Sequence, residues 1–238
     1  MKKIFIMILM SIFLVGCGRN KNELIMVTEA GFAPFEYYEN GEVVGVDVEI
    51  AKEIAKELGK ELVIKDVAFD SIINEVKTGK ADIGAAGISY SEERSKQVDF
   101  SNDYFTSNLI IIIKNSSNEN EYSNLSNKKI AVQLGSTADT YITKKYKDAN
   151  IVRQKKYLTT IEDLRNDKVD CVVMDELPAK SILQNNKDLK IINNIISSEN
   201  YGMIVKKGNK ELLNIVNKVI DRLINEGKID EYIIQYTK

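Results

Sequence analysis

Polar side chains suited to holding an anion follow ADIGAAG (81–87), a run of small and apolar residues with the composition of a buried strand. Ser89, Ser91 and Arg94 come shortly after Gly87, the last glycine of that run. The planar guanidinium of an arginine binds a carboxylate through two parallel hydrogen bonds. We therefore predict that this stretch binds a carboxylate, with Arg94 as its main contact. On spacing alone, Arg94 is also compatible with a solvated helix face.

Complementary groups follow strand-like runs in the second half of the chain. Ser136 and Thr137 come after KKIAVQL (128–134), at the predicted start of a helix, where unpaired backbone N–H groups attract anions. Asp175 ends the apolar run VDCVVMD (169–175) and can accept hydrogen bonds from an ammonium group. A cation, a carboxylate and helix-terminal donors together complement a free α-amino acid. Taken by itself, Asp175 is more simply interpreted as the N-cap of the following helix.

One further carboxylate and two aromatic rings come from the first half of the chain. Glu29 and Phe32 follow ELIMVT (23–28), and Phe69 follows ELVIKDV (61–67); both runs are predicted strands. These side chains are candidates for the same cleft as the cation and the helix-terminal donors. The alternative is that the two rings belong to the core and that Glu29 faces solvent.

Strands and helices alternate along the chain, and this order must position those residues. DVEIAKEIAKELG (47–59) has apolar residues at helical spacing, with Asp47 as the predicted N-cap and Gly59 as the stop. The alternation predicts βαβ units and mostly parallel sheets. The remaining predicted strands are 81–87, 108–115, 128–134, 150–155, 169–175, 189–196 and 201–207, and the remaining predicted helices are 70–79, 136–146, 159–167, 176–186 and 209–227.

An internal similarity indicates two lobes of the same design. EVKTGKADIGAAGIS (75–89) and DLRNDKVDCVVMDEL (163–177) both run from a helix end through a turn into an apolar strand that ends at polar residues. Ligands of open α/β sheets bind outside the carboxyl ends of the strands. We therefore expect both strand ends to face a cleft between two lobes.

Composition argues against several classes of function. The chain has 238 residues, of which 44% are hydrophobic and 29% charged, as is typical of a globular protein. It contains no histidine, the commonest zinc ligand and general base. Its net charge of −2 gives no indication of nucleic-acid binding. The sequence has no G-x-x-x-x-G-K-[ST] phosphate loop. We therefore expect no metal, no cofactor, no nucleic-acid partner and no ATP hydrolysis by this chain.

The first residues are typical of an export signal. A basic start precedes the apolar run IFIMILMSIFLV (4–15), which is short for a membrane span. The sequence LVGC, ending at Cys17, resembles a bacterial lipobox, in which the cysteine becomes the lipid-modified N-terminus. We therefore expect a lipoprotein signal peptide at 1–16 and a tether at 17–23. A simple cleaved signal peptide with an incidental cysteine is the alternative.

With these motifs in place, the chain resembles the family 3 extracellular solute-binding proteins, the receptor components of polar amino acid ABC transporters. The spacing G-I-S-x-S-x-E-R (87–94), followed by V-D-F-S (98–101), is specific to that family. The resemblance covers essentially the whole chain after the signal peptide. The matching stretches are 31–59, 69–105, 128–141, 167–179 and 197–232.

The resemblance implies roles for the two ends of a bound amino acid. Arg94 is expected to hold the α-carboxylate, assisted by the backbone and hydroxyl of Thr137. The Gly87 carbonyl, Ser89 and Asp175 are expected to hold the α-ammonium group. Ser91 is expected to cap the helix that carries Arg94 rather than to touch the ligand.

The resemblance also implies which residues face the side chain of the ligand. Phe32 and Phe69 are expected to sandwich it, and Glu29 is expected near its head. A carboxylate there favours a cation or an amide and disfavours an acidic ligand. A basic amino acid (arginine, lysine or ornithine) is the leading expectation, with glutamine and cystine left open.

The fold implied by the resemblance is an α/β, two-lobed periplasmic-binding-protein-like (type II) fold. Each lobe is expected to be a mixed, mostly parallel sheet flanked by helices, and a two-strand hinge joins the lobes. Lobe 1 is expected to comprise 24–107 and 199–238, and lobe 2 to comprise 110–195, with hinge crossings near 106–110 and 194–198.

The implied function is that of a monomeric, non-enzymatic subunit of an ABC importer. The protein is expected to be exported and lipid-anchored to the outer face of the cell membrane. There it would deliver a free L-amino acid to its partner, an ABC permease, and would be linked through the permease to an ATPase subunit. The alternatives are a cyclohexadienyl-dehydratase-like enzyme on the same scaffold and a ligand sensor for a signalling partner.

Overall fold

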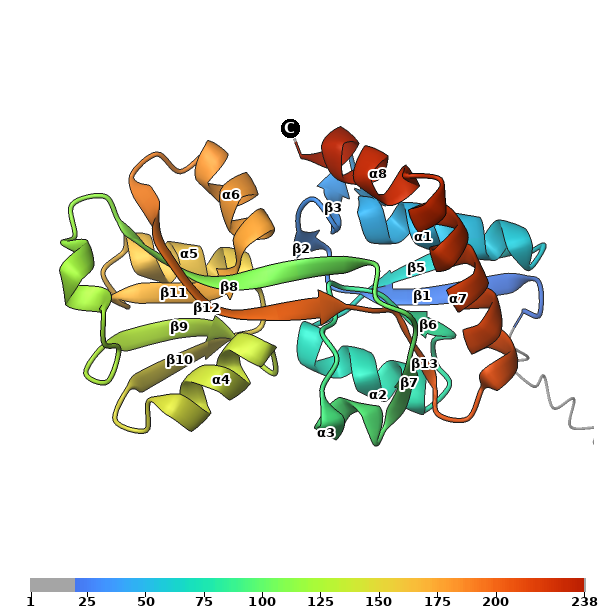
Figure 1. Ribbon diagram of the computed structural model, residues 1–238, viewed down its shortest axis with the longest axis horizontal. Helices are drawn as coiled ribbons and strands as arrows, with labels where there is room; N and C mark the ends of the chain where they lie inside the picture. The colour runs from blue at the N-terminus through green and yellow to red at the C-terminus, as the bar shows by residue number, and fades with distance from the viewer. Residues whose placement is uncertain (1–19, 238) are drawn as a thin grey trace, which may run out of the picture.

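The computed structural model describes residues 20–237, which form two lobes side by side (Figure 1). The predicted signal peptide at 1–16, the predicted lipidation site Cys17 and the start of the predicted tether lie outside the described residues. Within the described part, each lobe is built around a five-stranded sheet, and a three-stranded sheet is added to the first. No helix in residues 20–237 is long and apolar enough to cross a membrane.

The first lobe contains a sheet with the strand order β5-β1-β6-β13-β7. Strand β1 pairs in parallel with β5 and β6, whereas β13 runs antiparallel to β6 and β7. Helices α1 and α7 pack against each other, and α2 packs against β1 and β13. The bounds are β1 Glu23–Thr28, α1 Val46–Glu57, β5 Glu61–Asp66, a 3-10 turn Phe69–Ser71, α2 Ile72–Lys77, β6 Ile83–Gly84, α3 Glu92–Ser95, β7 Val98–Phe100, β13 Ile204–Lys206, α7 Lys210–Asn225 and α8 Lys228–Tyr236.

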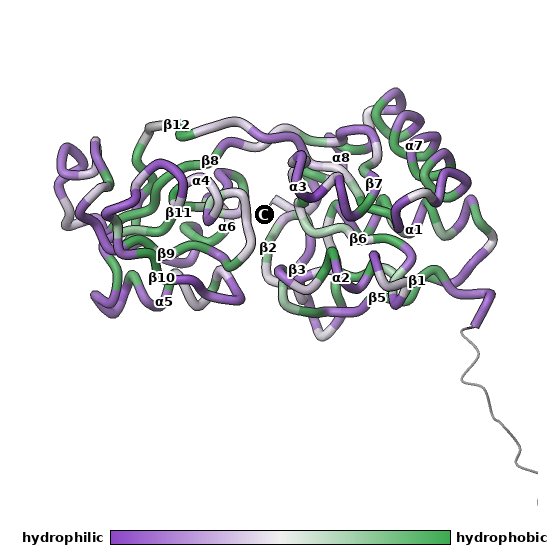
Figure 2. The backbone as a smooth tube through the Cα atoms, turned by 90° about the horizontal axis from the view of Figure 1, so that it is seen from below, coloured by the Kyte–Doolittle hydropathy of each residue, from purple (hydrophilic) through white to green (hydrophobic). Residues whose placement is uncertain are grey.

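The second lobe contains a sheet with the strand order β10-β9-β11-β8-β12. Strand β9 pairs in parallel with β10 and β11, whereas β8 runs antiparallel to β11 and β12. Hydrophobic residues lie along the central strands of this lobe (Figure 2). The bounds are β8 Phe105–Lys114, a 3-10 turn Glu119–Tyr122, β9 Lys129–Gln133, α4 Thr137–Lys145, β10 Asn150–Gln154, α5 Tyr157–Arg165, β11 Cys171–Asp175, α6 Glu176–Gln184 and β12 Leu189–Tyr201.

Two long antiparallel strands, β8 and β12, run from one lobe into the other (Figure 1). Their register shifts between Ile192 and Ser197, a range that overlaps the second predicted hinge crossing at 194–198. The segment 109–113 of β8 is buried, because it forms part of the core of the second lobe. The residue limits predicted for the two lobes and for the hinge stay predictions.

The predicted helix 47–59 is present, but its N-cap was wrongly predicted. Helix α1 begins at Val46, and Asp47 lies inside its first turn, fully buried. The carboxylate accepts hydrogen bonds from the Gly87 backbone N–H at 3.1 Å and from the Tyr104 hydroxyl at 2.7 Å. The Asp47 side chain therefore bonds to residues distant in the chain instead of capping its own helix. The predicted stop is confirmed, because Gly59 has a φ of +65° and follows the last turn.

Three other elements differ from the prediction. A small sheet of β2 Gly31–Phe32, β3 Glu36–Glu39 and β4 Glu42–Val44 lies in a region for which no strand was predicted. The predicted strand 81–87 pairs only at β6, because the chain leaves the sheet after Gly84. The predicted helix 209–227 ends near Gly227 as expected, with a φ of +70° at that glycine, but a further helix, α8, follows it in a region for which no helix was predicted.

Candidate functional site

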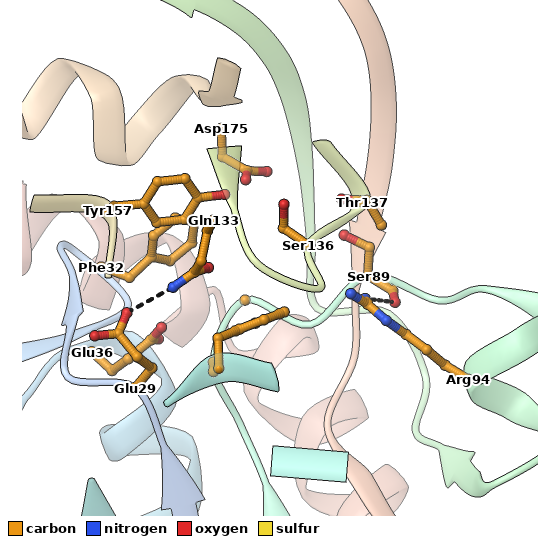
Figure 3. A pocket seen from close by; sticks show the side chains of 13 residues that line it. Glu29, Phe32, Glu36, Ser89, Arg94, Gln133, Ser136, Thr137, Tyr157 and Asp175 are labelled. Carbon is orange, nitrogen blue, oxygen red and sulfur yellow. Dashed lines mark hydrogen bonds between the residues drawn. The ribbon is translucent and has the colours of Figure 1, made fainter. Parts of the chain in front are cut away.

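Residues from both lobes line one small cavity (Figure 3). The cavity lies where β1, β9 and β11 end at their carboxyl termini, as expected for open α/β sheets. All eight residues predicted to bind the ligand line it. The full lining is Glu29, Phe32, Glu36, Phe69, Ala86, Gly87, Ser89, Arg94, Gln133, Ser136, Thr137, Tyr157 and Asp175.

Arg94 is held in the cavity wall by a capped turn and two backbone carbonyls. The Ser91 hydroxyl accepts a hydrogen bond from the Arg94 backbone N–H at 3.1 Å, which confirms the predicted cap of α3. The guanidinium donates from Nη1 to the Ser89 carbonyl at 2.7 Å and from Nη2 to the Gly135 carbonyl at 2.9 Å. Arg94 is 8% exposed. Because Gly135 belongs to the second lobe, the guanidinium also links the two lobes.

The start of α4 faces Arg94 across the cleft. The Ser136 hydroxyl caps this helix by accepting from the Asp139 backbone N–H at 3.1 Å. The Thr137 hydroxyl donates to the Glu199 carboxylate, which also accepts from the Ser89 hydroxyl at 2.7 Å. Glu199, on β12, thus connects a hydroxyl of each lobe. No role was predicted for Glu199, because its partners lie far away along the chain.

Asp175 ends β11 and faces the same cavity. Its backbone occupies the N-cap position of α6, but its side chain makes no capping hydrogen bond. Instead the carboxylate accepts from the Tyr201 hydroxyl at 2.5 Å. Burial raises the pKa of Asp175 to about 7, and the Tyr201 hydrogen bond opposes that rise. The predicted N-cap position of Asp175 is therefore confirmed, but its side chain does not cap the helix.

The aromatic rings of the site have partners that were not predicted. Phe32 stacks on Tyr157 of the second lobe, with ring centroids 5.3 Å apart and planes inclined by 22°. Phe69 lies under the guanidinium of Arg94, whose Cζ is 5.6 Å from the ring centroid. Gly87 has a φ of +53°, and a Cβ there would lie 2.7 Å from the Phe32 ring. Glycine at this position therefore lets the backbone approach Phe32 closely.

Tyr157 was missed because the helix that carries it was predicted to begin two positions later along the chain, at 159. In the structure α5 begins at Tyr157 itself, and the ring is buried. An aromatic residue at the first position of a helix that faces a cleft was the signal available in the sequence.

Glu29 lies at the other end of the cavity from Arg94 (Figure 3). It is 1% exposed, and its Oε2 accepts a hydrogen bond from the Gln133 side-chain amide at 3.1 Å. Burial raises the pKa of Glu29 to about 7, and the nearby Lys156 ammonium group opposes that rise. The alternative that Glu29 faces solvent is therefore wrong.

Glu36 lies beside Glu29 and had no predicted role. It is fully buried, and neither carboxyl oxygen has a hydrogen bond of normal length to a described residue. Burial, and then the neighbouring Asp47 carboxylate, raise the pKa of Glu36 well above its ordinary value. Burial likewise raises the pKa of Asp47 to about 6. The cavity therefore has a guanidinium at one end and a cluster of buried carboxyl groups at the other.

Comparisons with known proteins agree with this geometry. Residues 24–238 match the family model described as bacterial extracellular solute-binding proteins, family 3. The arginine-binding extracellular protein ArtP of Bacillus subtilis is 29% identical over 91% of this chain and 86% of its own length. A probable histidine-binding protein of Campylobacter jejuni is 31% identical over 98% of this chain and 96% of its own length.

A solved structure shares the same architecture. The amino acid ABC transporter substrate-binding protein AbpA from Streptococcus pneumoniae, bound to L-arginine, superposes with a TM-score of 0.86 and is 35% identical. The match covers 91% of this chain and 95% of that one. The relatives named here are binding proteins rather than enzymes. This chain belongs to the bacterial extracellular solute-binding proteins of family 3, and it has their type II periplasmic-binding-protein fold.

Proposed function

We propose that this protein binds a free L-amino acid with a cationic side chain, arginine above all, between its two lobes and delivers it to a membrane permease. The proposal rests on the distribution of charge between the two ends of the cavity. A guanidinium lies at one end, in Arg94, and the buried carboxyl groups of Glu29 and Glu36 lie at the other (Figure 3). An amino acid with a cationic side chain has the complementary order of charges.

The two ends of the ligand's backbone have separate partners in this arrangement. Arg94 takes the α-carboxylate, because two carbonyls orient its planar fork and leave part of its donor set for a ligand. Thr137, at the start of α4, assists it. The Gly87 carbonyl, Ser89 and Asp175 take the α-ammonium group.

The side chain of the ligand extends toward the acidic end. Phe32 and Tyr157 provide flat faces there, and a guanidinium stacks well on aromatic rings. Phe69 lines the same cavity on the side of Arg94. Glu29 then accepts hydrogen bonds from the cationic head. The relatives named for arginine and histidine support a ligand of this class.

Delivery to a permease follows from the two-lobed design. Residues from both lobes contribute to the site, so a ligand stabilises the arrangement in which the lobes meet. The strands β8 and β12 are the two connections about which the lobes would move. Export, a lipid anchor at Cys17, and a permease with its ATPase as partners complete the proposal. They rest on the N-terminal motif and the family.

Thermal stability of the purified protein in the presence of single amino acids tests the proposal. Arginine at 100 times its Kd stabilises the folded protein by about 2.7 kcal/mol, which corresponds to roughly 5–10 °C in Tm for a chain of this size. Lysine and ornithine should give smaller shifts, and glutamate and aspartate none. A shift with glutamine but with no cationic amino acid would contradict the proposed ligand class.

A further inference from the structure

A lysine outside the cavity reaches the acidic end of the site from the opposite lobe. Lys156 occupies the N-cap position of α5 in the second lobe. Its Nζ lies 3.7 Å from Glu29 Oε1 and 3.5 Å from Asp66 Oδ2, both in the first lobe. Asp66 is itself held by hydrogen bonds from the Ala30 backbone N–H at 3.0 Å and the Tyr38 hydroxyl at 3.4 Å. The ammonium group therefore spans the two lobes next to the proposed ligand head.

The two carboxyl oxygens of Glu29 differ in their partners. Oε2 accepts from the Gln133 amide, whereas Oε1 is buried without a hydrogen bond to a described residue. A buried acceptor without a donor is costly, so a donor on a ligand head gains by reaching Oε1. The Lys156 ammonium lies beyond hydrogen-bond distance of this same oxygen but close enough for strong electrostatic attraction.

A cationic ligand head at Oε1 would therefore meet two opposing charges: the carboxylate of Glu29 attracts it and the ammonium of Lys156 repels it. A neutral head of the same shape gains the hydrogen bond without that repulsion. We propose that Lys156 is a specificity-determining residue, which weakens the preference of the site for a cationic head over a neutral hydrogen-bonding head. This inference rests on the proposed function, because it assigns the ligand head to Glu29.

Arginine and citrulline form a matched pair of ligands for the test. Their side chains have nearly the same shape, but arginine ends in a cationic guanidinium and citrulline in a neutral urea. The measured quantity is the ratio of their Kd values, obtained by isothermal titration calorimetry. A ratio cancels any general effect of a substitution on lobe closure. Titration at pH 8 keeps Glu29, whose pKa is about 7, mostly ionised.

Lys156→Met is compared with Lys155→Met, which removes the same charge from an adjacent exposed position for which the described structure gives no ion pair. In Lys156→Met the preference for arginine over citrulline should increase about three- to tenfold. The effect stays moderate because the Lys156 side chain is 49% exposed and partly screened. In Lys155→Met the ratio should stay within about twofold of that of the unmodified protein. Lys156→Gln, a polar replacement, should change the ratio in the same direction as Lys156→Met.

The outcomes distinguish a failure of this inference from a failure of the proposed function. If the unmodified protein binds both amino acids and the ratio is unchanged or falls in both Lys156 variants, the role of Lys156 is wrong and the proposed function stands. An equal increase in Lys155→Met would also overturn it, because a general charge effect would then explain the result. If the unmodified protein binds neither amino acid, the proposed function fails and the inference fails with it.

Discussion

The two ends of the cavity are built on opposite principles. At the Arg94 end, backbone carbonyls orient the charged group from both lobes, and a capped turn fixes its position. At the Glu29 and Glu36 end, carboxyl groups are buried with few hydrogen bonds, and burial raises their pKa values. The first end is preorganised for a group that every amino acid carries. The second end is electrostatically unfavourable by itself, and a cationic side chain would relieve it.

The largest effect expected is the loss of the fixed cation. Arg94→Ala should weaken the binding of every amino acid by at least about 100-fold, because a buried carboxylate without its partner costs about 3–5 kcal/mol. Isothermal titration calorimetry with arginine and lysine measures the loss. Arg165→Ala, which breaks an exposed ion pair between the end of α5 and Asp188, is the control and should leave affinity unchanged. Unimpaired binding by a folded Arg94→Ala variant would refute the assignment of this end.

The next effect is a pH dependence of the preference for a cationic ligand head. The pKa of Glu29, about 7, is raised above its ordinary value, so the carboxyl group is protonated at low pH and ionised at high pH. A cationic head prefers the ionised form, so the ratio of arginine affinity to citrulline affinity should rise about tenfold between pH 6 and pH 8. The ratio cancels the titration of Asp175, whose pKa is also about 7 and which is proposed to hold the α-ammonium group of both ligands. Glu29→Gln should remove the pH dependence of the ratio; an unchanged pH dependence would assign the proton to another group.

The same raised pKa values make a prediction about stability. A carboxyl group whose pKa is raised on folding contributes stability at low pH, and that contribution is lost as the pH rises through its folded pKa. Glu36 has such a raised pKa, so its ionisation opposes folding at high pH. Glu36→Gln removes the ionisation and should raise Tm by about 2–5 °C at pH 8 without added amino acid.

Differential scanning calorimetry at pH 5 and pH 8 measures the Glu36 effect. The gain should be smaller at pH 5, because the raised pKa of Glu36 favours its protonated form as the pH falls. Glu42→Gln, on the exposed edge of β4, is the matched control and should change Tm by less than about 1 °C at either pH. A lower Tm for Glu36→Gln at pH 8 would mean that its carboxylate stabilises the fold.

The smallest effect expected concerns the support of Arg94. Ser91→Ala removes the hydroxyl that caps α3 and should cost about 1 kcal/mol of unfolding free energy. Arginine affinity should fall by no more than about threefold, because the two carbonyls that orient the guanidinium remain. Urea denaturation and calorimetric titration measure the two quantities. A loss of affinity as large as that of Arg94→Ala would show that the cap, rather than the carbonyls, positions the guanidinium.

Local patterns in the sequence were sufficient to predict much of the architecture. The alternation of strands and helices, the stop at Gly59 and the cap at Ser91 were confirmed, and so were the family and the fold. Each depends on residues close together in the chain or on a motif of fixed spacing. The eight residues predicted for the site do line one cavity, while their contacts with a ligand stay predictions.

Contacts between distant segments account for what the sequence did not reveal. Asp47 is of a residue type favoured at N-caps, but its carboxylate accepts hydrogen bonds from the Gly87 backbone N–H and the Tyr104 hydroxyl. The Asp175 carboxylate accepts a hydrogen bond from the Tyr201 hydroxyl. Tyr157 and Glu36 were not predicted to belong to the site at all. Their burial depends on which surfaces meet when the two lobes come together.

The sequence by itself therefore determined the kinds of element, their order and the guanidinium end of the site, because short-range spacing encodes them. Only the tertiary structure decided that Glu29 and Glu36 are buried together and that Lys156 reaches Glu29 from the other lobe. The energy of a charged group depends on its burial and on neighbours brought near by folding, and neither quantity is a property of the local sequence.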